Sequence, residues 1–203
     1  MFEELTQDYP IYARSTFLPE PRGNWRQRWT TRLDRLRVVL LVKNWLPVLL
    51  YRLRVWCRRH HVPVLPYACD LLARAGWNVY IGDHAEIGPG LYLAHGNVVI
   101  DGIVTIGRNC RINPWVSIGL SNSVRLGFSF RGPTIGDNVS IGTGAKVLGP
   151  ITVGNNVKIG ANAVVIADVP DGATAIGVPA RVVSRSAPST ASDLASSDGP
   201  RDA

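Results

Sequence analysis

The sequence predicts a mainly β protein in which a coil of short parallel strands follows a small helical domain. Two observations carry this prediction: aliphatic residues recur every six positions from residue 81 to residue 165, and glycine follows most of them. A third is the stretch before the repeat, where apolar residues and arginines are interleaved as in amphipathic helices. The aliphatic positions are Ile81, Ile87, Leu93, Val99, Ile106, Ile112, Ile118, Ile135, Ile141, Val147, Val153, Ile159 and Val165.

A period of six fits neither an α-helix nor a strand bounded by hairpin turns. It fits a coil in which each unit forms one flat side, with the aliphatic side chain pointing inward and a glycine turning the corner after it. The step from Val99 to Ile106 is seven residues, so we expect one extra residue after Val99. A second inward position, four residues after the first, holds Ala85, Cys110, Val116, Val139, Ala145, Ile151, Val157, Ala163 and Val169.

The repeat is interrupted between Ile118 and Ile135, and we expect residues 119–134 to leave the coil as a loop. This segment contains glycines, serines, arginines and two phenylalanines. Long irregular segments on a rigid scaffold commonly carry function. The coil and its loop are expected to occupy residues 77–183, and the Ser/Ala/Asp-rich residues 184–203 to form a disordered tail.

Residues 1–76 are expected to form the helical domain. The first 80 residues hold 13 Lys plus Arg against 6 Asp plus Glu, which accounts for the whole net charge of +7. Because these arginines alternate with Leu, Val and Trp, we interpret them as solvated helix faces and expect no nucleic-acid partner. Peripheral contact with a membrane surface is the alternative. The apolar run of residues 38–51 contains Lys43 and Pro47 and is too short for the roughly 20 residues of a membrane span.

The cysteines and histidines indicate the redox compartment and exclude some kinds of catalytic site. Cys57, Cys69 and Cys110 are an odd number at wide spacings, and the chain starts without a signal-peptide pattern, so we expect a reduced, cytoplasmic protein. Cys110 occupies an inward position of the repeat, which favours core packing over a nucleophilic role. Only His84 and His95 lie in the repeat, too few for a three-histidine zinc site, and we expect no metal.

Several motifs resemble the hexapeptide-repeat acyltransferases, and serine acetyltransferase most closely. They are the hexads, LAHG at 93–96, IGTGAKVLGPITVG at 141–154, VKIGANAVV at 157–165 and GVPARVV at 177–183, with YRLRVW at 51–56 resembling a Tyr-Arg-x-x-x-Trp stretch of that family's helical domain. The resemblance implies a left-handed parallel β-helix. It also implies a homotrimer, or a dimer of trimers, with acetyl-CoA in the groove between neighbouring coils.

The activity implied by this resemblance is acetyl-CoA-dependent O-acetylation of a small hydroxyl acceptor. Such a transfer needs a base for the hydroxyl proton and donors for the developing oxyanion. His95 lies where the family has its catalytic histidine, and backbone amides near the loop are the expected oxyanion donors. Arg131 matches the arginine that binds the acceptor's carboxylate, a group that guanidinium geometry suits.

The cofactor side of the resemblance rests on four further residues. Thr143 and Ala161 match positions whose backbone amides bind the pantetheine arm, at corners where small residues permit close approach. Lys158 and Arg181 match positions where positive charge meets the phosphates of CoA. No metal is required by this scheme.

Two polar partners of the family's active site are replaced in this chain. Where the family has Asp-His, the sequence reads Ala94-His95, and where it has Arg-His-Pro, the sequence reads Arg131-Gly132-Pro133. These replacements favour a changed acceptor over a lost activity. Three hypotheses therefore stand: a serine O-acetyltransferase-like enzyme, an O-acetyltransferase for a sugar or polysaccharide precursor, and a non-catalytic trimeric scaffold.

Overall fold

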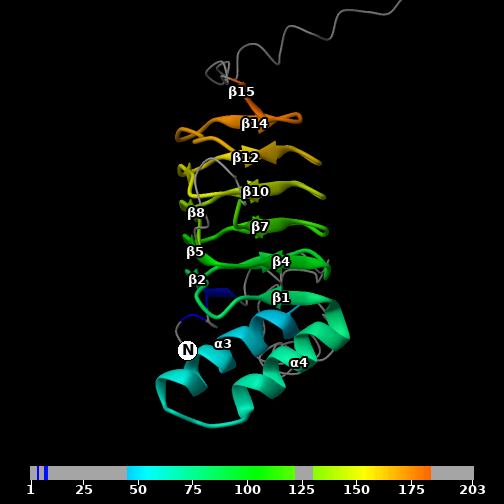
Figure 1. Ribbon diagram of the computed structural model, residues 1–203, viewed down its shortest axis with the longest axis vertical. Coiled ribbons are helices and arrows are strands. Elements are labelled where there is room, and N and C mark those ends of the chain that lie inside the picture. Colours follow the sequence, from blue (N-terminus) through cyan, green and yellow to red (C-terminus); the bar gives the residue numbers. More distant parts are fainter. Residues whose placement is uncertain (1–3, 5–6, 9–44, 122–129, 184–203) are drawn as a thin grey trace, which may run out of the picture.

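A computed structural model describes residue 4 and residues 7–8, 45–121 and 130–183 of the chain. Two helices, α3 (Leu46–Arg59) and α4 (Leu65–Trp77), lie at the base of a column of short strands (Figure 1). The strands are β1 (Val79–Ile81), β2 (Glu86–Ile87), β3 (Tyr92–Leu93), β4 (Val98–Ile100), β5 (Ile103–Ile106), β6 (Arg111–Ile112), β7 (Ser117–Gly119), β8 (Arg131–Ile135), β9 (Ser140–Ile141), β10 (Lys146–Leu148), β11 (Thr152–Val153), β12 (Lys158–Ile159), β13 (Val164–Val165), β14 (Thr174–Ile176) and β15 (Arg181–Val183).

Strands three apart in the sequence stack on one another in parallel, so the chain winds into a three-sided coil. Face A consists of β1, β4, β7, β10 and β13, face B of β2, β5, β8 and β11, and face C of β3, β6, β9, β12 and β14. The last strand, β15, pairs antiparallel with β14 and ends face C. We name the three edges by the faces that the chain joins there: the A–B, B–C and C–A edges.

The core fills the inside of the coil as the repeat predicts, with one exception. Both sets of inward positions are buried, down to 0% exposure at Ile141. Val99 is instead 43% exposed, and its neighbours Val98 and Ile100 are buried. Ile100 pairs with Ile81 and with Ile118 in face A. The extra residue therefore lies before Ile100, at the corner that follows Leu93, and the prediction that it follows Val99 is wrong.

The corners also differ from the prediction. The left-handed residue is the third after the inward aliphatic residue, where Asn109, Asn138 and Asn162 have φ of 55°, 57° and 56°. The glycine directly after the aliphatic residue is needed for space. A Cβ at Gly142 would lie 2.5 Å from the backbone nitrogen of Ala161 in the next coil. Glycine there allows the coils to stack closely, and asparagine turns the corner.

The interruption of the repeat is shorter than expected. Strand β7 of face A ends at Gly119, and the next strand, β8 of face B, begins at Arg131. Residues 131–135 are therefore part of a strand and not of the loop. The reason is that β8 pairs with β5 from Ile103 onward, before the hexad pattern returns at Ile135. Residues 122–129 of the predicted loop, residues 9–44 and the predicted tail lie outside the described part of the chain.

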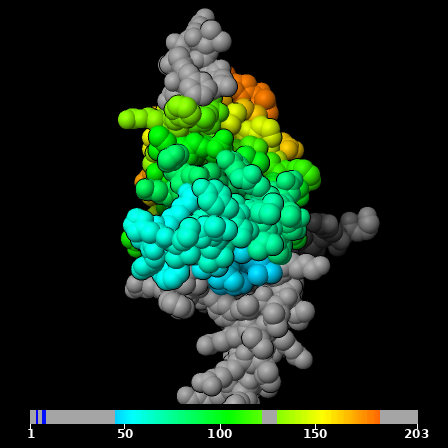
Figure 2. Space-filling model, turned by 60° about the horizontal axis from the view of Figure 1, so that its bottom comes forward, coloured from blue at the N-terminus to red at the C-terminus, as the bar shows by residue number. Residues whose placement is uncertain are grey.

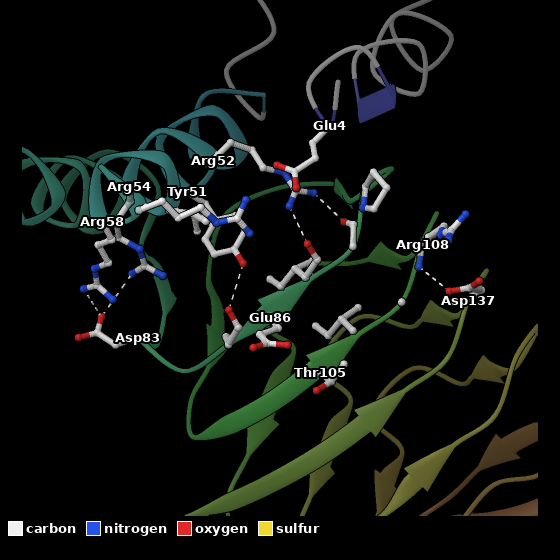
Figure 3. A pocket seen from close by; sticks show the side chains of 18 residues that line it. Glu4, Tyr51, Arg52, Arg54, Arg58, Asp83, Glu86, Thr105, Arg108 and Asp137 are labelled. Atoms are coloured by element: carbon white, nitrogen blue, oxygen red, sulfur yellow. Dashed lines mark hydrogen bonds and ion pairs between the residues drawn. The ribbon is translucent and has the colours of Figure 1, made fainter. Parts of the chain in front are cut away.

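Helix α3 closes the lower end of the coil, and its residues Arg52 and Arg54 are buried there. The first coil has no coil beneath it, so its lower backbone groups need other partners. Arg52 donates to the carbonyls of Ile87 and Gly88, both at 2.6 Å. Arg54 donates to the carbonyls of Ile81 and Gly82, and Tyr51 Oη to that of Ala85 (Figure 3). Figure 2 shows this base, with both helices lying across the end of the column.

The expectation that arginines cover solvated faces is therefore wrong for Arg52 and Arg54, which are 3% and 2% exposed. Arg52 Nε also pairs with Asp8 at 3.0 Å. Asp8 Oδ1 accepts from the backbone amides of Gly90 and Leu91, so this carboxylate caps the amides as the arginines cap the carbonyls. Burial raises the pKa of Asp8, while Arg52 and the two amides oppose that rise.

Helix α4 packs on α3 and leaves an apolar side uncovered. Tyr67, Leu71 and Leu72 are 75%, 68% and 56% exposed. In the described part of the chain, neither helix has the length and apolar character needed to cross a bilayer.

Candidate active site

The C–A edge brings several of the predicted residues into one line. Each strand of face C is followed by a corner, and these corners stack through backbone hydrogen bonds: Trp115 N–H to Asn97 O at 2.8 Å, Gly144 N–H to Pro114 O at 3.0 Å and Asn162 N–H to Thr143 O at 2.8 Å. His95, Thr143 and Ala161 therefore lie along a single edge of the coil, in its first, third and fourth corners. All three are exposed.

The scale of this edge follows from strand spacing. Successive coils are about 4.8 Å apart, so the corner of His95 and the corner of Ala161 are separated by roughly 14 Å. The inserted residue of the first coil lies in the corner that carries His95, between Leu93 and Ile100. This corner therefore has one residue more than those above it, and His95 lies exposed within it.

The amides of the C–A edge differ from those of the B–C edge. On the B–C edge, the corner amide of Arg108 donates to the Asp137 side chain, that of Asp137 to Asn155, and that of Asn155 to Asp171, at 2.7 to 2.8 Å. On the C–A edge the matching positions are Pro114, Thr143 and Ala161, which have no such side chains above them. Among the described residues, neither the Thr143 nor the Ala161 amide donates a hydrogen bond. Along the edge that carries His95, two backbone donors are thus left without an acceptor among the described residues.

Positive charge lies at the upper end of the same edge. Arg181 pairs with Ile176 in face C, and Ile176 lies over Gly160, the residue before Ala161. Lys158 is exposed on the outer side of face C, in the strand that leads to Ala161. The edge therefore has an imidazole at its lower end, open amides in the middle and cations close to its upper end.

Arg131 lies at a different edge of the coil. It begins β8 and pairs with Ile103, at the A–B edge, whereas His95 precedes face A at the C–A edge. The two residues thus stand at opposite ends of the face A strands of one chain. The next residue, Gly132, is buried, and a Cβ added there would lie 2.6 Å from Val104 Cγ2. A histidine does not fit at position 132 without displacement of Val104.

Cavities also lie away from the C–A edge, and two of them bear on the predicted residues. One of about 500 Å³ at the A–B edge is lined by Tyr80, Asp83, His84, Asp101, Gly102, Ile103, Leu120 and Phe130. The other, of about 610 Å³, lies between α3 and the first coils, where Arg58 forms an ion pair with Asp83 at 2.6 Å (Figure 3). Its buried arginines are already bound to backbone carbonyls, which marks it as part of the base closure.

Two other sequence hypotheses can be tested on the geometry. Cys110 is buried, its Sγ donates to Gly136 O at 3.2 Å, and burial raises the pKa of its thiol. These features agree with core packing and oppose a thiolate nucleophile. Within the described ranges, no three His, Cys, Asp or Glu side chains cluster as a metal site would require.

Comparison with known proteins identifies the family. The family model described as bacterial transferase hexapeptide (six repeats) matches residues 132–167. Serine acetyltransferase of Synechococcus elongatus is 37% identical over 187 residues, which cover 92% of this chain and 70% of that enzyme. The chain belongs to the serine acetyltransferase family. A Helicobacter pylori serine acetyltransferase is 37% identical over 153 residues, covering 75% of this chain and 88% of that one.

Solved structures of this family confirm the fold prediction. The Neisseria gonorrhoeae serine acetyltransferase gives a TM-score of 0.74 at 29% identity and covers 95% of this chain and 70% of that chain. The same enzyme in complex with serine gives a TM-score of 0.71 at 28% identity, covering 90% and 69%. A serine acetyltransferase in complex with CoA gives 0.60 at 33% identity, covering 68% and 55%. The left-handed parallel β-helix expected from the motifs is therefore the fold of this family member.

Some residues of interest were not singled out from the sequence. Trp115 turns a corner of the C–A edge with φ of 65° and is 61% exposed. Its position in the hexad could have flagged it, because asparagine or glycine stands at the matching positions. Asp8 carries no sequence signal of its capping role, since its partners are some 80 residues away.

Proposed function

We propose that this serine acetyltransferase family member transfers the acetyl group of acetyl-CoA directly to the hydroxyl of a small acceptor. His95 removes the hydroxyl proton as the oxygen attacks the thioester carbonyl, and backbone amides stabilise the resulting oxyanion. Collapse of the tetrahedral intermediate releases the CoA thiolate, which takes up a proton. The observation that carries this proposal is the alignment of His95, Thr143 and Ala161 on one edge.

Acetyl-CoA, the acyl donor, lies along the C–A edge with its thioester beside His95 and its nucleotide end toward the upper coils. The open amides of Thr143 and Ala161 donate to the carbonyl groups of the pantetheine arm, and Lys158 and Arg181 meet the phosphates of CoA. The separation of roughly 14 Å between the first and fourth corners suits an extended arm that ends in a thioester. The B–C edge, whose corner amides already donate to Asp and Asn side chains, offers no comparable track.

The acceptor site is shared between two copies of the chain. His95 and Arg131 stand at opposite edges of face A, so a single chain does not offer both to one acceptor. In a homotrimer the C–A edge of one chain faces the A–B edge of its neighbour, which brings the two residues to one groove. A dimer of such trimers, joined through the helical bases, is a further assembly that this arrangement permits.

L-Serine is the first acceptor to test, because the related enzymes are named for it and one binds serine in its crystal structure. A sugar hydroxyl is the alternative. It is supported by Ala94, which replaces a carboxylate beside His95, and by Gly132, where a larger side chain would displace Val104. The three free cysteines accord with action in the cytoplasm.

The deciding experiment follows release of free CoA from acetyl-CoA by the purified chain, with L-serine, other hydroxy amino acids and a panel of sugars. We expect turnover with one acceptor class and a fall of at least about 100-fold in kcat for His95→Ala. His60→Ala, which removes an exposed histidine at the end of α3, away from both edges, is the matched control and should retain activity. Near-normal turnover by His95→Ala would remove this histidine from the mechanism.

The scaffold hypothesis makes the opposite prediction for the donor. A non-catalytic trimer would not bind acetyl-CoA, and titration calorimetry would give no heat of binding. If no acceptor gives CoA release but acetyl-CoA still binds, the panel lacks the right acceptor.

A further inference from the structure

Trp115 has a backbone conformation that its residue type disfavours. Within the described β-helix, the left-handed corner positions are held by asparagine and glycine, and Trp115, with φ of 65°, is the one bulky exception. A left-handed φ is costly for a residue with a large side chain, and such strain collects at binding sites. The indole does not compensate by burial, because 61% of the residue is exposed.

The location of this residue links it to acyl transfer. Trp115 turns the second corner of the C–A edge, one coil above His95 and one coil below Thr143. Its N–H donates to Asn97 O in the His95 corner, and Gly144 in the Thr143 corner donates to Pro114 O. Trp115 therefore stands between the proposed base and the first open amide.

The second corner has no open amide of its own. Thr143 and Ala161 present N–H groups at the third and fourth corners, but the matching residue of the second corner is Pro114, which lacks an N–H. The second corner thus has an apolar aromatic side chain where the next two have polar donors. A ligand lying along this edge meets an apolar surface directly above His95 and polar donors farther up.

We propose that Trp115 is a donor-binding residue whose indole packs against the thioester end of the pantetheine arm and holds the acetyl group beside His95. The sulfur and the adjacent methylenes are the least polar part of the arm and match an aromatic face, whereas the amide-bearing part matches the corners above. This inference rests on the proposed function, since it assigns the donor's orientation along the C–A edge.

The test uses Trp115→Asn, because asparagine occupies the matching corner at position 162 with a left-handed φ. This variant should fold at least as stably as the parent chain, with an unchanged or higher Tm. Its affinity for CoA should fall about tenfold or more, while its affinity for 3′-phospho-ADP, which lacks the arm, stays the same. Trp115→Phe should keep most of the CoA affinity, and Trp56→Gln, which removes a partly exposed indole from α3, is the matched control.

Steady-state kinetics and light scattering of the Trp115→Asn variant distinguish the proposal from its alternatives. A raised KM for acetyl-CoA with an unchanged KM for the acceptor supports the assignment, and a raised acceptor KM with unchanged CoA affinity overturns it. Loss of the trimer in Trp115→Asn, measured by light scattering, would instead make the indole a subunit contact and also overturn it. Failure of the proposed function itself is a separate result: the parent chain would then bind no CoA.

Discussion

At the scale of single residues, the site is a standard corner modified at two points. An inserted residue widens the first corner of the C–A edge around His95, and a tryptophan occupies the second corner where asparagine or glycine would be relaxed. In the proposed mechanism, the neighbours of His95 decide which acceptor this histidine can serve. Ala94 is the residue where a single change restores the carboxylate typical of the family.

We predict that Ala94→Asp raises kcat/KM for L-serine by about tenfold, because a carboxylate beside the imidazole orients it and stabilises its protonated form. Acetylation of a sugar acceptor should not rise in parallel. The measurement is steady-state kinetics with both acceptor classes, and Ala94→Asn, of equal size without the charge, is the control. An unchanged or lower rate with serine would show that the missing aspartate does not limit this enzyme.

Cys110 gives a prediction about chemical reactivity. Because burial raises the pKa of its thiol, Cys110 should stay unmodified by iodoacetamide at pH 8 in the folded chain and react rapidly after unfolding. Peptide mass mapping of the alkylated protein measures this. Rapid labelling of the folded chain would contradict the core assignment of this residue.

The residue scale also shows what the sequence can and cannot predict. His95 was found because it stands in a motif, LAHG, that resembles the family. The insertion was misplaced because Val98, Val99 and Ile100 are all apolar, so a six-residue count admits more than one register. Trp115 was missed because a sequence does not display the sign of φ, and only the paired strands fix which residue turns the corner.

At the scale of elements, helix α3 is a closure for the coil. Its arginines and tyrosine donate to the carbonyls of the first coil, and Asp8 accepts from its amides. Helical periodicity in YRLRVW predicts the helix but not its surroundings. Arg52 and Arg54 are buried because they donate to backbone carbonyls that lack a partner only once the coil has formed. Charge alone therefore predicts that these arginines are exposed to solvent.

Removal of one closing arginine should destabilise the whole fold. Arg52→Met leaves Asp8 as an unpaired buried carboxylate and the carbonyls of Ile87 and Gly88 without donors, at an expected cost of about 3–5 kcal/mol in the free energy of unfolding. Denaturant unfolding measures the loss. Arg59→Met, an exposed arginine of the same helix, should change stability by less than about 0.5 kcal/mol. Equal effects of the two variants would refute the closing role of Arg52.

The exposed side of α4 makes a prediction about the base of the molecule. If Tyr67, Leu71 and Leu72 contact a membrane, as the basic N-terminal half suggests, the chain should sediment with anionic vesicles and Leu71→Glu should abolish sedimentation. If they join two trimers, Leu71→Glu should instead halve the assembly mass measured by light scattering. If Leu71→Glu changes neither the sedimentation with vesicles nor the assembly mass, α4 takes part in neither contact.

At the scale of the whole molecule, the proposed shared acceptor site predicts that His95 and Arg131 act together only across two copies of the chain. His95→Ala and Arg131→Ala variants should each be inactive with serine. Mixed after mild dissociation and reassembly, they should regain about a quarter of the parent activity, because that share of interfaces then pairs an intact His95 with an intact Arg131. A mixture that stays inactive would place both residues in a site within one chain.

The architecture of the molecule was predictable from the hexads, whereas the junctions were not. The coil of short strands follows from the aliphatic spacing, and a helical domain follows from the amphipathic stretch before it. The start of β8 at Arg131 was hidden because Gly132 and Pro133 do not continue the hexad pattern, although Arg131 before them and Thr134 after them pair with β5 in face B.

The closed base has a consequence for how the protein behaves at high concentration. A stack of parallel coils is a solenoid, and an unprotected end presents a row of backbone donors and acceptors that matches the end of another molecule. Arg52, Arg54, Tyr51 and Asp8 occupy that row below, and the antiparallel β15 ends face C above. The same contacts that hold the helix in place therefore keep separate molecules from joining end to end into fibres.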